Sequence, residues 1–528
     1  MIHRHPLRCV LLACLVSLAA LPAAAQIETV SVTGGAVRGV VSDGIASFKG
    51  IPFAAPPVGS LRWKAPQPVK PWTGVREADR YAPACMQEER FVAMMGAPPE
   101  VSEDCLYLNV WTPAKSPGEK LPVMVWIYGG AFVGGMTSAP LYDGTNLARR
   151  GVVLVSVAYR VGPFGFLVHP ALSRESGKGS GNYGLLDQIA ALRWVQENIE
   201  KFGGDPQNVT IFGESAGAIS VSMLAASPAA KGLFHRVISQ SGGSFAPPKY
   251  ENEGGQNVLP LSVAERNGTR FLSSLGAKDI SAARKLGAAA IQKAAAALGT
   301  GSFWPVVDGS VIVGDQYELY VAGRFNDTPV LIGTNSDEGA LFVPPGSVTP
   351  EAFAERVRAG YGEHADRILA VYPHATPDEA HEAAKDIFRD SAFAWHTWAW
   401  ARLHSRKAEG PAYVYYFDHR TPSSPDGANH AAEIPYVFGN LGGPDGPPRP
   451  EDAAMSQLMM SYWVNFARNG DPNGPGLPKW SKFGEFTQQV MHFDAMPGMR
   501  PVPNLKQLQA LDAYYAWRRE RLKKKPAS

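Results

Sequence analysis

The sequence predicts an α/β protein whose mostly parallel central sheet is flanked by helices. Short runs of apolar and β-branched residues, as at 121–130 and 151–160, lack the alternation of a strand that has one face in water. A segment with helical spacing at 183–204 ends on a pair of glycines, a common signal for the end of a helix. Unalternating strands separated by helices indicate a parallel sheet that is buried on both faces.

Further strands follow that helix in the order expected of such a sheet. The run Asn-Val-Thr-Ile-Phe at 208–212 is apolar and β-branched, and a small-residue segment with helical character comes after it. Three more strand-to-loop units then follow, at residues 235–242, 328–339 and 412–420.

Two stretches do not fit the strand–helix alternation. Residues 244–330 begin with a loop rich in Pro, Gly and Asn and continue into Ala-rich helical segments, and residues 350–408 are helical and aromatic. We expect both to be helical insertions that cap one end of the sheet. They would belong to one domain that spans residues 26–516, followed by a basic tail at 517–528.

Composition gives no indication of a charged macromolecular partner. The 528 residues carry a formal net charge of +2, which is too balanced to favour nucleic acid or an anionic membrane surface. The basic end at 517–525 is typical of a solvated terminal helix. No stretch after the first 25 residues is long and apolar enough to span a membrane, and the oligomeric state is not indicated.

Residues 1–25 have the layout of a secretory signal peptide. Basic residues precede an apolar stretch at 9–21, and small residues follow up to an expected cleavage site after Ala25. A lipoprotein site at Cys14 is the alternative, although cleavage there would truncate the apolar region. The sequence therefore predicts a secreted or periplasmic protein.

Cleavage would leave two cysteines, Cys85 and Cys105. Exported proteins form disulfides, so we expect these two to pair. Loop-closure entropy makes such a crosslink worth roughly 3 kcal/mol. Two cysteines without a neighbouring histidine do not make a usual metal site, and the sequence implies no metal or other cofactor.

The segment Gly-Glu-Ser-Ala-Gly at 213–217 joins the strand at 208–212 to the helix that follows. A serine on such a sharp turn is the nucleophile of α/β-hydrolases, and glycines on both sides relieve crowding against the neighbouring backbone. Ser215 is therefore the candidate nucleophile. Because a serine hydroxyl reacts weakly alone, it needs a base and an acid that orients the base.

The order of triad residues in this fold places the acid and then the histidine after the serine. Asp337 and Glu338 both follow the strand at 330–333, and the residues alone leave the choice between them open. His430 lies on the loop after the next strand, while His419 at the end of that strand is its rival.

A glycine-rich turn after the strand at 121–130 is the candidate oxyanion hole. Backbone N–H groups of Gly130 and Ala131, together with that of Ala216 after the nucleophile, are the expected donors to a tetrahedral intermediate.

Five ordered motifs make a resemblance to one family specific. They are EDCLYLNVWTP at 103–113, IYGGAF at 127–132, the run from GNYGLLD to GESAGA at 181–218, DEG at 337–339 and NHAAEIPYVFG at 429–439. The chain resembles the type-B carboxylesterases, the cholinesterase-like branch of the α/β-hydrolases, from about Val37 to near residue 515.

The resemblance implies roles for particular residues. Glu338 rather than Asp337 is the triad acid, His430 is the base, and Cys85 pairs with Cys105. Glu214 and Glu433 are similar to buried acids beside the family's triad.

Two departures from the family pattern concern the substrate. Many members have a third glycine where this chain has Ala131, whose N–H can still donate, so we expect altered room near the alcohol group. In cholinesterases the loop between the paired cysteines carries the tryptophan that holds choline, and the corresponding loop at 86–104 has none. This difference argues against choline esters as preferred substrates.

The resemblance therefore implies a secreted serine carboxylesterase that hydrolyses small-molecule esters through an acyl-enzyme on Ser215. A non-catalytic binding protein of the same family is one alternative, and the presence of all three triad residues argues against it. A lipase or amidase on the same scaffold is another, since triad chemistry does not distinguish these substrates.

Overall fold

The computed structural model describes residues 26–98, 100–249, 257–299, 301–443 and 445–524. The predicted signal peptide at 1–25, its cleavage after Ala25 and the alternative at Cys14 lie outside these residues. None of the helices in the described ranges combines the length and the hydropathy that a membrane span requires.

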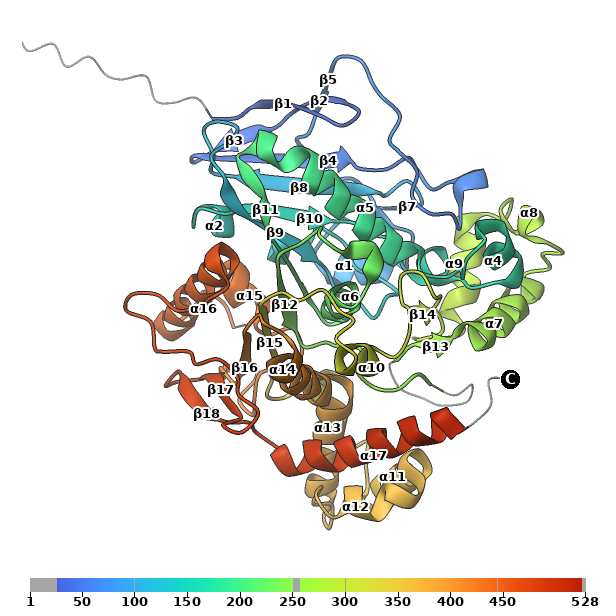
Figure 1. Ribbon diagram of the computed structural model, residues 1–528, viewed down its shortest axis with the longest axis vertical. Helices are drawn as coiled ribbons and strands as arrows, with labels where there is room; N and C mark the ends of the chain where they lie inside the picture. The colour runs from blue at the N-terminus through green and yellow to red at the C-terminus, as the bar shows by residue number, and fades with distance from the viewer. Residues whose placement is uncertain (1–25, 99, 250–256, 300, 444, 525–528) are drawn as a thin grey trace, which may run out of the picture.

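An 11-stranded sheet runs through the described part of the molecule (Figure 1). Its parallel strands are, in spatial order, β17 (Gln489–Phe493), β16 (Ala412–Phe417), β15 (Val330–Asn335), β12 (Arg236–Gln240), β11 (Gly204–Glu214), β9 (Leu121–Ile127) and β10 (Val153–Val157). Antiparallel strands extend both edges, namely β18 (Gly498–Pro501) beside β17, and β8 (Tyr107–Thr112), β4 (Ile45–Pro52) and β3 (Val40–Ser42) beyond β10. Every residue of β10 and β15 is buried, which explains the missing alternation and confirms the predicted fold class.

Short strands outside the parallel core have weaker sequence patterns. Three of them form a small sheet, β1 (Thr29–Val32), β2 (Gly35–Arg38) and β5 (Val75–Glu77). Two-stranded pairs join β6 (Ala84–Cys85) to β7 (Val101–Ser102) and β13 (Leu259–Pro260) to β14 (Val306–Val307). None of these strands was predicted, because each is too short for its periodicity to stand out.

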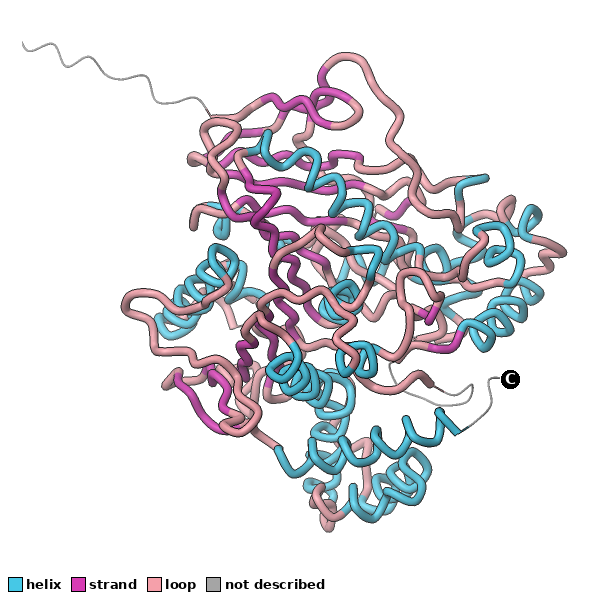
Figure 2. Tube along the Cα trace, in the orientation of Figure 1, coloured by secondary structure: helices cyan, strands magenta, loops and turns pink. Residues whose placement is uncertain are grey.

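Helices cover both faces of the large sheet, as Figure 2 shows with helices in cyan on either side of the magenta strands. On one side lie α2 (Thr145–Ala148), α15 (Ile434–Phe438) and α16 (Pro450–Asn469), and on the other α5 (Tyr183–Asn198) and α6 (Ala216–Ala225) (Figure 1). Helix α5 tightens into a 3₁₀ turn at Ile199–Phe202 and stops at Gly203, whose φ of 80° only glycine adopts without strain.

The two predicted insertions are helical. The first contains α7 (Leu261–Ser274), α8 (Ile280–Ala283), α9 (Ala288–Ala296) and α10 (Gln316–Val321). The second contains α11 (Pro350–Tyr361), α12 (Ala365–Leu369), α13 (Pro377–Arg389), a π-helical turn at Asp390–Ala394 and α14 (Trp395–Lys407). Three short helices precede them, α1 (Glu89–Met94), α3 (Gly162–Phe166) and α4 (Pro170–Ser176). In Figure 1, α7, α8 and α9 of the first insertion lie apart from the second, whereas α10 of the first lies beside α14 of the second.

The basic end is less solvated than its sequence suggested. It belongs to a continuous helix, α17 (Leu505–Lys524), which passes residue 516 without a break. Arg518 and Arg519 are buried, and Arg519 Nε lies 2.9 Å from Asp315 Oδ2 at the start of α10. The expectation of a solvated helix is therefore wrong for these two arginines, because they pack against the insertion helices.

Candidate active site

Ser215 occupies a strained turn between β11 and α6. Its φ of 53° is a conformation that side-chain-bearing residues rarely adopt, and its N–H donates to the carbonyl of Gln240 on β12 at 2.9 Å. A Cβ on Gly213 would lie 2.6 Å from the carbonyl oxygen of Ile127, and one on Gly217 would lie 2.0 Å from the same atom. Both glycines are thus required because the turn packs directly on the end of β9.

The predicted oxyanion donors lie on two backbone segments. Gly130 and Ala131, just beyond β9, have φ values of 115° and 52°, and Ala216 is the first residue of α6. Within the described ranges, none of these three N–H groups donates a hydrogen bond to the protein. The N–H of Ala216 also lies at a helix N-terminus, where the helix dipole favours negative charge.

A buried glutamine fixes the far end of the oxyanion loop. The Gln87 amide donates to the carbonyls of Cys85 and Gly135 at 2.9 and 2.7 Å and accepts from the Gly135 N–H at 2.8 Å. Cys85 is bonded to Cys105, which is the pairing that the sequence predicted. The disulfide therefore anchors the segment whose side chain clamps the oxyanion loop.

Glu338 and His430 are brought into direct contact. Nδ1 of His430 lies 2.5 Å from Oε2 of Glu338. The other carboxylate oxygen of Glu338 accepts from the Ser241 hydroxyl at 2.5 Å and from the Asn335 N–H at 2.7 Å. Glu338 is fully buried, so each of these partners replaces water that the carboxylate has lost.

Asp337, the alternative acid, has a different role. Its carboxylate lies 3.2 Å from Lys385 Nζ on α13. Its N–H donates to the carbonyl of Ala428 at 2.9 Å, and the Asn335 amide donates to the carbonyl of Asn429 at 2.8 Å. These bonds join the loop after β15 to the loop that carries His430.

The imidazole of His430 lies between two aromatic rings, Phe393 from the second insertion and Phe342 from the loop after β15. Phe393 stacks on it with centroids 4.7 Å apart and an angle of 17° between the ring planes, and Phe342 meets it edge-on at 5.4 Å. Phe393 lies on the π-helical turn at Asp390–Ala394, a local distortion that often occurs at functional sites.

A second carboxylate faces the other ring nitrogen of His430. Oε1 of Glu214, the residue before Ser215, lies 3.2 Å from Nε2. Burial alone lowers the pKa of His430, but the charges of Glu214 and Glu338 outweigh it and raise that pKa to about 9. Burial likewise raises the pKa of Glu214 to about 8, although the His430 charge opposes the rise.

Glu433 completes a buried group of three carboxylates. It accepts from the Gln240 amide at 2.9 Å and from the Asn335 amide at 2.6 Å, and no part of it is exposed. Burial, together with the charge of Glu338, raises its pKa. Its two amide partners hold it beside the site rather than in contact with the ring of His430.

His419 is not part of this cluster. Its Nε2 lies 2.7 Å from Asp452 Oδ1 on α16, so its ring is engaged in a buried pair elsewhere. Ser215 and His430 share no hydrogen bond in the described part of the chain, since Nε2 faces Glu214. Catalytic hydrogen bonds are often long before substrate binds.

Sequence reasoning missed Gln87, Asn335, Ser241 and Phe393. Gln87 lies close to Cys85, and Asn335 and Ser241 lie within the strand-to-loop units at 328–339 and 235–242. Their contacts with the site depend on the fold, which the spacing of residues does not reveal. Among the described residues, no group of three or more His, Cys, Asp or Glu side chains is arranged to hold a metal ion.

Comparisons with known proteins agree on one family. Residues 26–511 match the sequence model of the carboxylesterase family. The chain is 39% identical to the fumonisin B1 esterase of Sphingopyxis macrogoltabida, over 91% of this chain and 89% of that protein. It is 37% identical to the para-nitrobenzyl esterase of Bacillus subtilis (strain 168), over 92% and 98%. A solved structure of PNB esterase covers 92% of this chain and 99% of its own, with a TM-score of 0.79 at 37% identity.

Proposed function

The chain belongs to the carboxylesterase family and is a carboxylic ester hydrolase, and we propose that it works as an exported serine esterase whose nucleophile is Ser215. His430 is the general base and Glu338 the acid that orients it. The N–H groups of Gly130, Ala131 and Ala216 form the oxyanion hole.

The contact between Glu338 and His430 is the observation that carries this proposal. The two residues follow β15 and β16, while Ser215 follows β11 and the oxyanion loop follows β9. The carboxyl ends of neighbouring parallel strands meet at one edge of a sheet, where open α/β sheets bind their ligands. A base held at 2.5 Å by a buried acid at that edge is the arrangement that activates a serine.

In the first half of the proposed reaction, Ser215 Oγ attacks the ester carbonyl carbon while His430 Nε2 takes the hydroxyl proton. The carbonyl oxygen becomes an oxyanion that accepts from the three backbone N–H groups. The intermediate then collapses, the C–O bond to the alcohol breaks, and the imidazolium gives its proton to the leaving alcohol. An acyl ester of Ser215 remains.

In the second half, water attacks the acyl carbon and His430 takes its proton. Collapse of the second intermediate returns the proton to Ser215 Oγ and releases the carboxylic acid. Glu338 stays ionised throughout, holding the ring in one orientation and stabilising its positive charge.

The rings around His430 favour esters with an apolar group. Phe342 is half-exposed and stacks on Phe388 with centroids 4.4 Å apart, while Phe388 meets Phe393 at 6.0 Å. An apolar surface therefore leads from the solvent to the imidazole. We propose alkyl and aryl esters of small molecules as the substrate class.

Export is supported by two features. Residues 1–25 have the pattern of a signal peptide. Cys85 and Cys105 form a disulfide, which is typical of proteins from oxidising compartments.

Protein expressed from the full-length sequence tests the proposal directly. We expect hydrolysis of a short-chain p-nitrophenyl ester and addition of one fluorophosphonate probe to the peptide that contains Ser215. Both should disappear in Ser215→Ala and persist in Ser273→Ala, a matched change at an exposed serine of α7. Hydrolysis that survives Ser215→Ala would reject the nucleophile, and faster cleavage of the matching anilide than of the ester would favour an amidase.

A further inference from the structure

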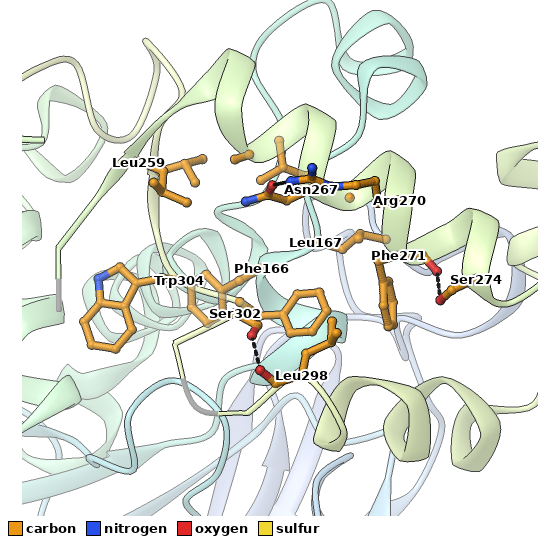
Figure 3. A pocket seen from close by; sticks show the side chains of 15 residues that line it. Phe166, Leu167, Leu259, Asn267, Arg270, Phe271, Ser274, Leu298, Ser302 and Trp304 are labelled. Atoms are coloured by element: carbon orange, nitrogen blue, oxygen red, sulfur yellow. Dashed lines mark hydrogen bonds between the residues drawn. The ribbon is translucent and has the colours of Figure 1, made fainter. Parts of the chain in front are cut away.

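A cavity of about 460 Å³ lies beneath helix α7, away from the residues assigned above to ester hydrolysis (Figure 3). Its walls come from α7, from residues 298, 302–304 and 306, and from the end of α3 with the two residues that follow it. We refer to it as the α7 cavity. Its volume is in the range of small-molecule sites, which runs from about 300 to 1,000 Å³.

The lining of the α7 cavity is mostly apolar. Phe271 and Phe303 pack edge-to-face with centroids 5.0 Å apart, and Leu298 has 54% of its surface exposed. The two serine hydroxyls in the wall are already engaged, because Ser274 donates to the carbonyl of Phe271 and Ser302 to that of Leu298 (Figure 3).

Two larger polar side chains, Asn267 and Arg270, also line the space, and Arg270 Nη2 donates to Asn267 Oδ1. An occupant would therefore make apolar contacts over most of its surface and meet these polar groups at one wall.

Close backbone packing keeps α7 from collapsing into this space. A Cβ on Gly268 would lie 1.6 Å from the carbonyl oxygen of Val168, so the helix backbone already touches the opposite wall there. Ser173 on α4 also donates to Glu265 on α7 at 2.6 Å. The cavity is thus a fixed part of the fold, not a gap that a small shift of α7 would close.

One polar group in the lining lacks a partner. Trp304 is 5% exposed, and its indole N–H has no hydrogen-bond acceptor among the described residues. Figure 3 draws this nitrogen on the side of the ring away from the other lining residues, so an acceptor group on an occupant would meet the N–H groups of Asn267 or Arg270 instead.

The α7 cavity also shares a wall with the oxyanion loop. The ring of Phe132, next to Ala131, meets Phe166 at 5.1 Å and Trp304 at 4.8 Å between centroids. The carbonyl of Phe132 accepts from the N–H of Gly162 at 2.6 Å, which fixes the loop on that side. The buried Phe132 ring thus joins the oxyanion loop to the lining of the cavity.

We propose that the α7 cavity is a second ligand site, one that takes a neutral apolar molecule carrying a hydrogen-bond acceptor. Alkyl and aryl ketones, ethers and esters have this chemistry. The ligand binds while Ser215 is occupied, because it does not use the nucleophile, the oxyanion donors or His430.

The neutral fluorescent ketone Prodan is a suitable probe, because its emission reports transfer to apolar surroundings. We expect saturable binding to the purified protein. Ser274→Trp and Ser302→Trp fill the cavity from opposite walls at exposed positions, and each should weaken binding at least tenfold. The matched control Ser273→Trp, which adds the same side chain one residue away outside the lining, should bind as the parent does. Trp304→Phe, which removes an N–H that faces away from the cavity and some ring area, should weaken binding less than Ser274→Trp or Ser302→Trp does.

A second experiment locates the probe relative to the ester site. Protein labelled at Ser215 with a fluorophosphonate should bind Prodan as tightly as unlabelled protein. Loss of binding on labelling, equal binding by all three serine-to-tryptophan variants, or no saturable binding would each overturn the proposal. If Ser215 does not label, the proposed esterase mechanism fails, while the tryptophan series still decides the fate of this site.

Discussion

Replacing Glu214 by glutamine tests how the buried charges control the proposed base. The substitution keeps the shape of the side chain and removes the negative charge that lies 3.2 Å from His430 Nε2. That charge stabilises the imidazolium, so its loss lowers the pKa of His430 from the raised value of about 9. More of the histidine is then neutral at low pH and able to act as a base.

Coulomb's law gives the size of the effect. At 3.2 Å the attraction is about 1.3 kcal/mol in a medium as polar as water and about 5 kcal/mol at an effective dielectric constant of about 20. One pKa unit corresponds to about 1.4 kcal/mol, so these limits are about 1 and 4 units. Burial raises the pKa of Glu214 itself to about 8, so near neutral pH the carboxyl is only partly ionised, and the shift lies close to the lower limit.

The pH dependence of kcat/KM for a p-nitrophenyl ester measures this shift, because its acid limb reports the base in the free enzyme. In Glu214→Gln we expect the acid limb to move down by about 1 pH unit. The ratio of kcat/KM at pH 6 to its plateau value should then be about tenfold higher than in the parent protein. Glu433→Gln is the comparison, since that carboxylate bonds to Gln240 and Asn335 instead of the ring and should give a smaller shift. An acid limb that stays in place or moves up in Glu214→Gln, with probe labelling intact, would refute the electrostatic reasoning.

Three further predictions concern the framework of the site. Glu338→Gln should lower kcat about 10³- to 10⁴-fold while Asp337→Asn keeps most activity, as measured by initial rates; equal losses would reject Glu338 as the orienting acid. Gly217→Ala places a Cβ 2.0 Å from a backbone oxygen of β9 and should destabilise the fold by about 3 kcal/mol, which calorimetry measures as a lower Tm. Gly287 has open space around it, so Gly287→Ala should leave Tm unchanged. Gln87→Leu leaves buried backbone groups unpaired at the end of the oxyanion loop, so it should lower both Tm and kcat with little change in KM. Unchanged kinetics would show that the contacts of Gln87 with the loop do not affect catalysis.

The parallel core of the fold was predictable because its signals are local and repeated. Strands β9, β10, β11, β12, β15 and β16 read as short apolar runs, and a glycine marks the end of the helix between two of them, at Gly203 after α5. The antiparallel strands β3, β4 and β8 were missed. Strand β3 has only three residues, the register of β4 shifts between Phe48 and Ile51, and β8 is buried along five of its six residues, so none of the three shows a regular alternation.

The candidate site was predictable as a set of residues but not as a set of contacts. Ser215 is marked by its glycines, whose need the packing against Ile127 explains. Spacing did not distinguish Glu338 from Asp337, because both follow the same strand and only the fold decides which side chain points to His430. Phe393 could not be assigned to the site, since its place depends on a π-helical turn that no local pattern specifies.

The two carboxylates that face His430 have different surroundings, and the difference suggests how the base becomes available. Glu338 accepts hydrogen bonds from the Ser241 hydroxyl and the Asn335 N–H, which hold it against Nδ1. Oε1 of Glu214 accepts no hydrogen bond from the described residues, and burial raises the pKa of this carboxyl. Because the pKa of His430, about 9, lies above that of Glu214, about 8, a proton between them rests on Nε2 near neutral pH and must leave before the imidazole can act as a base. Nε2 must also leave Glu214 and bond to the Ser215 hydroxyl. Protonation of Glu214 makes this change of partner easier, because the neutral carboxyl no longer attracts the ring as an anion does.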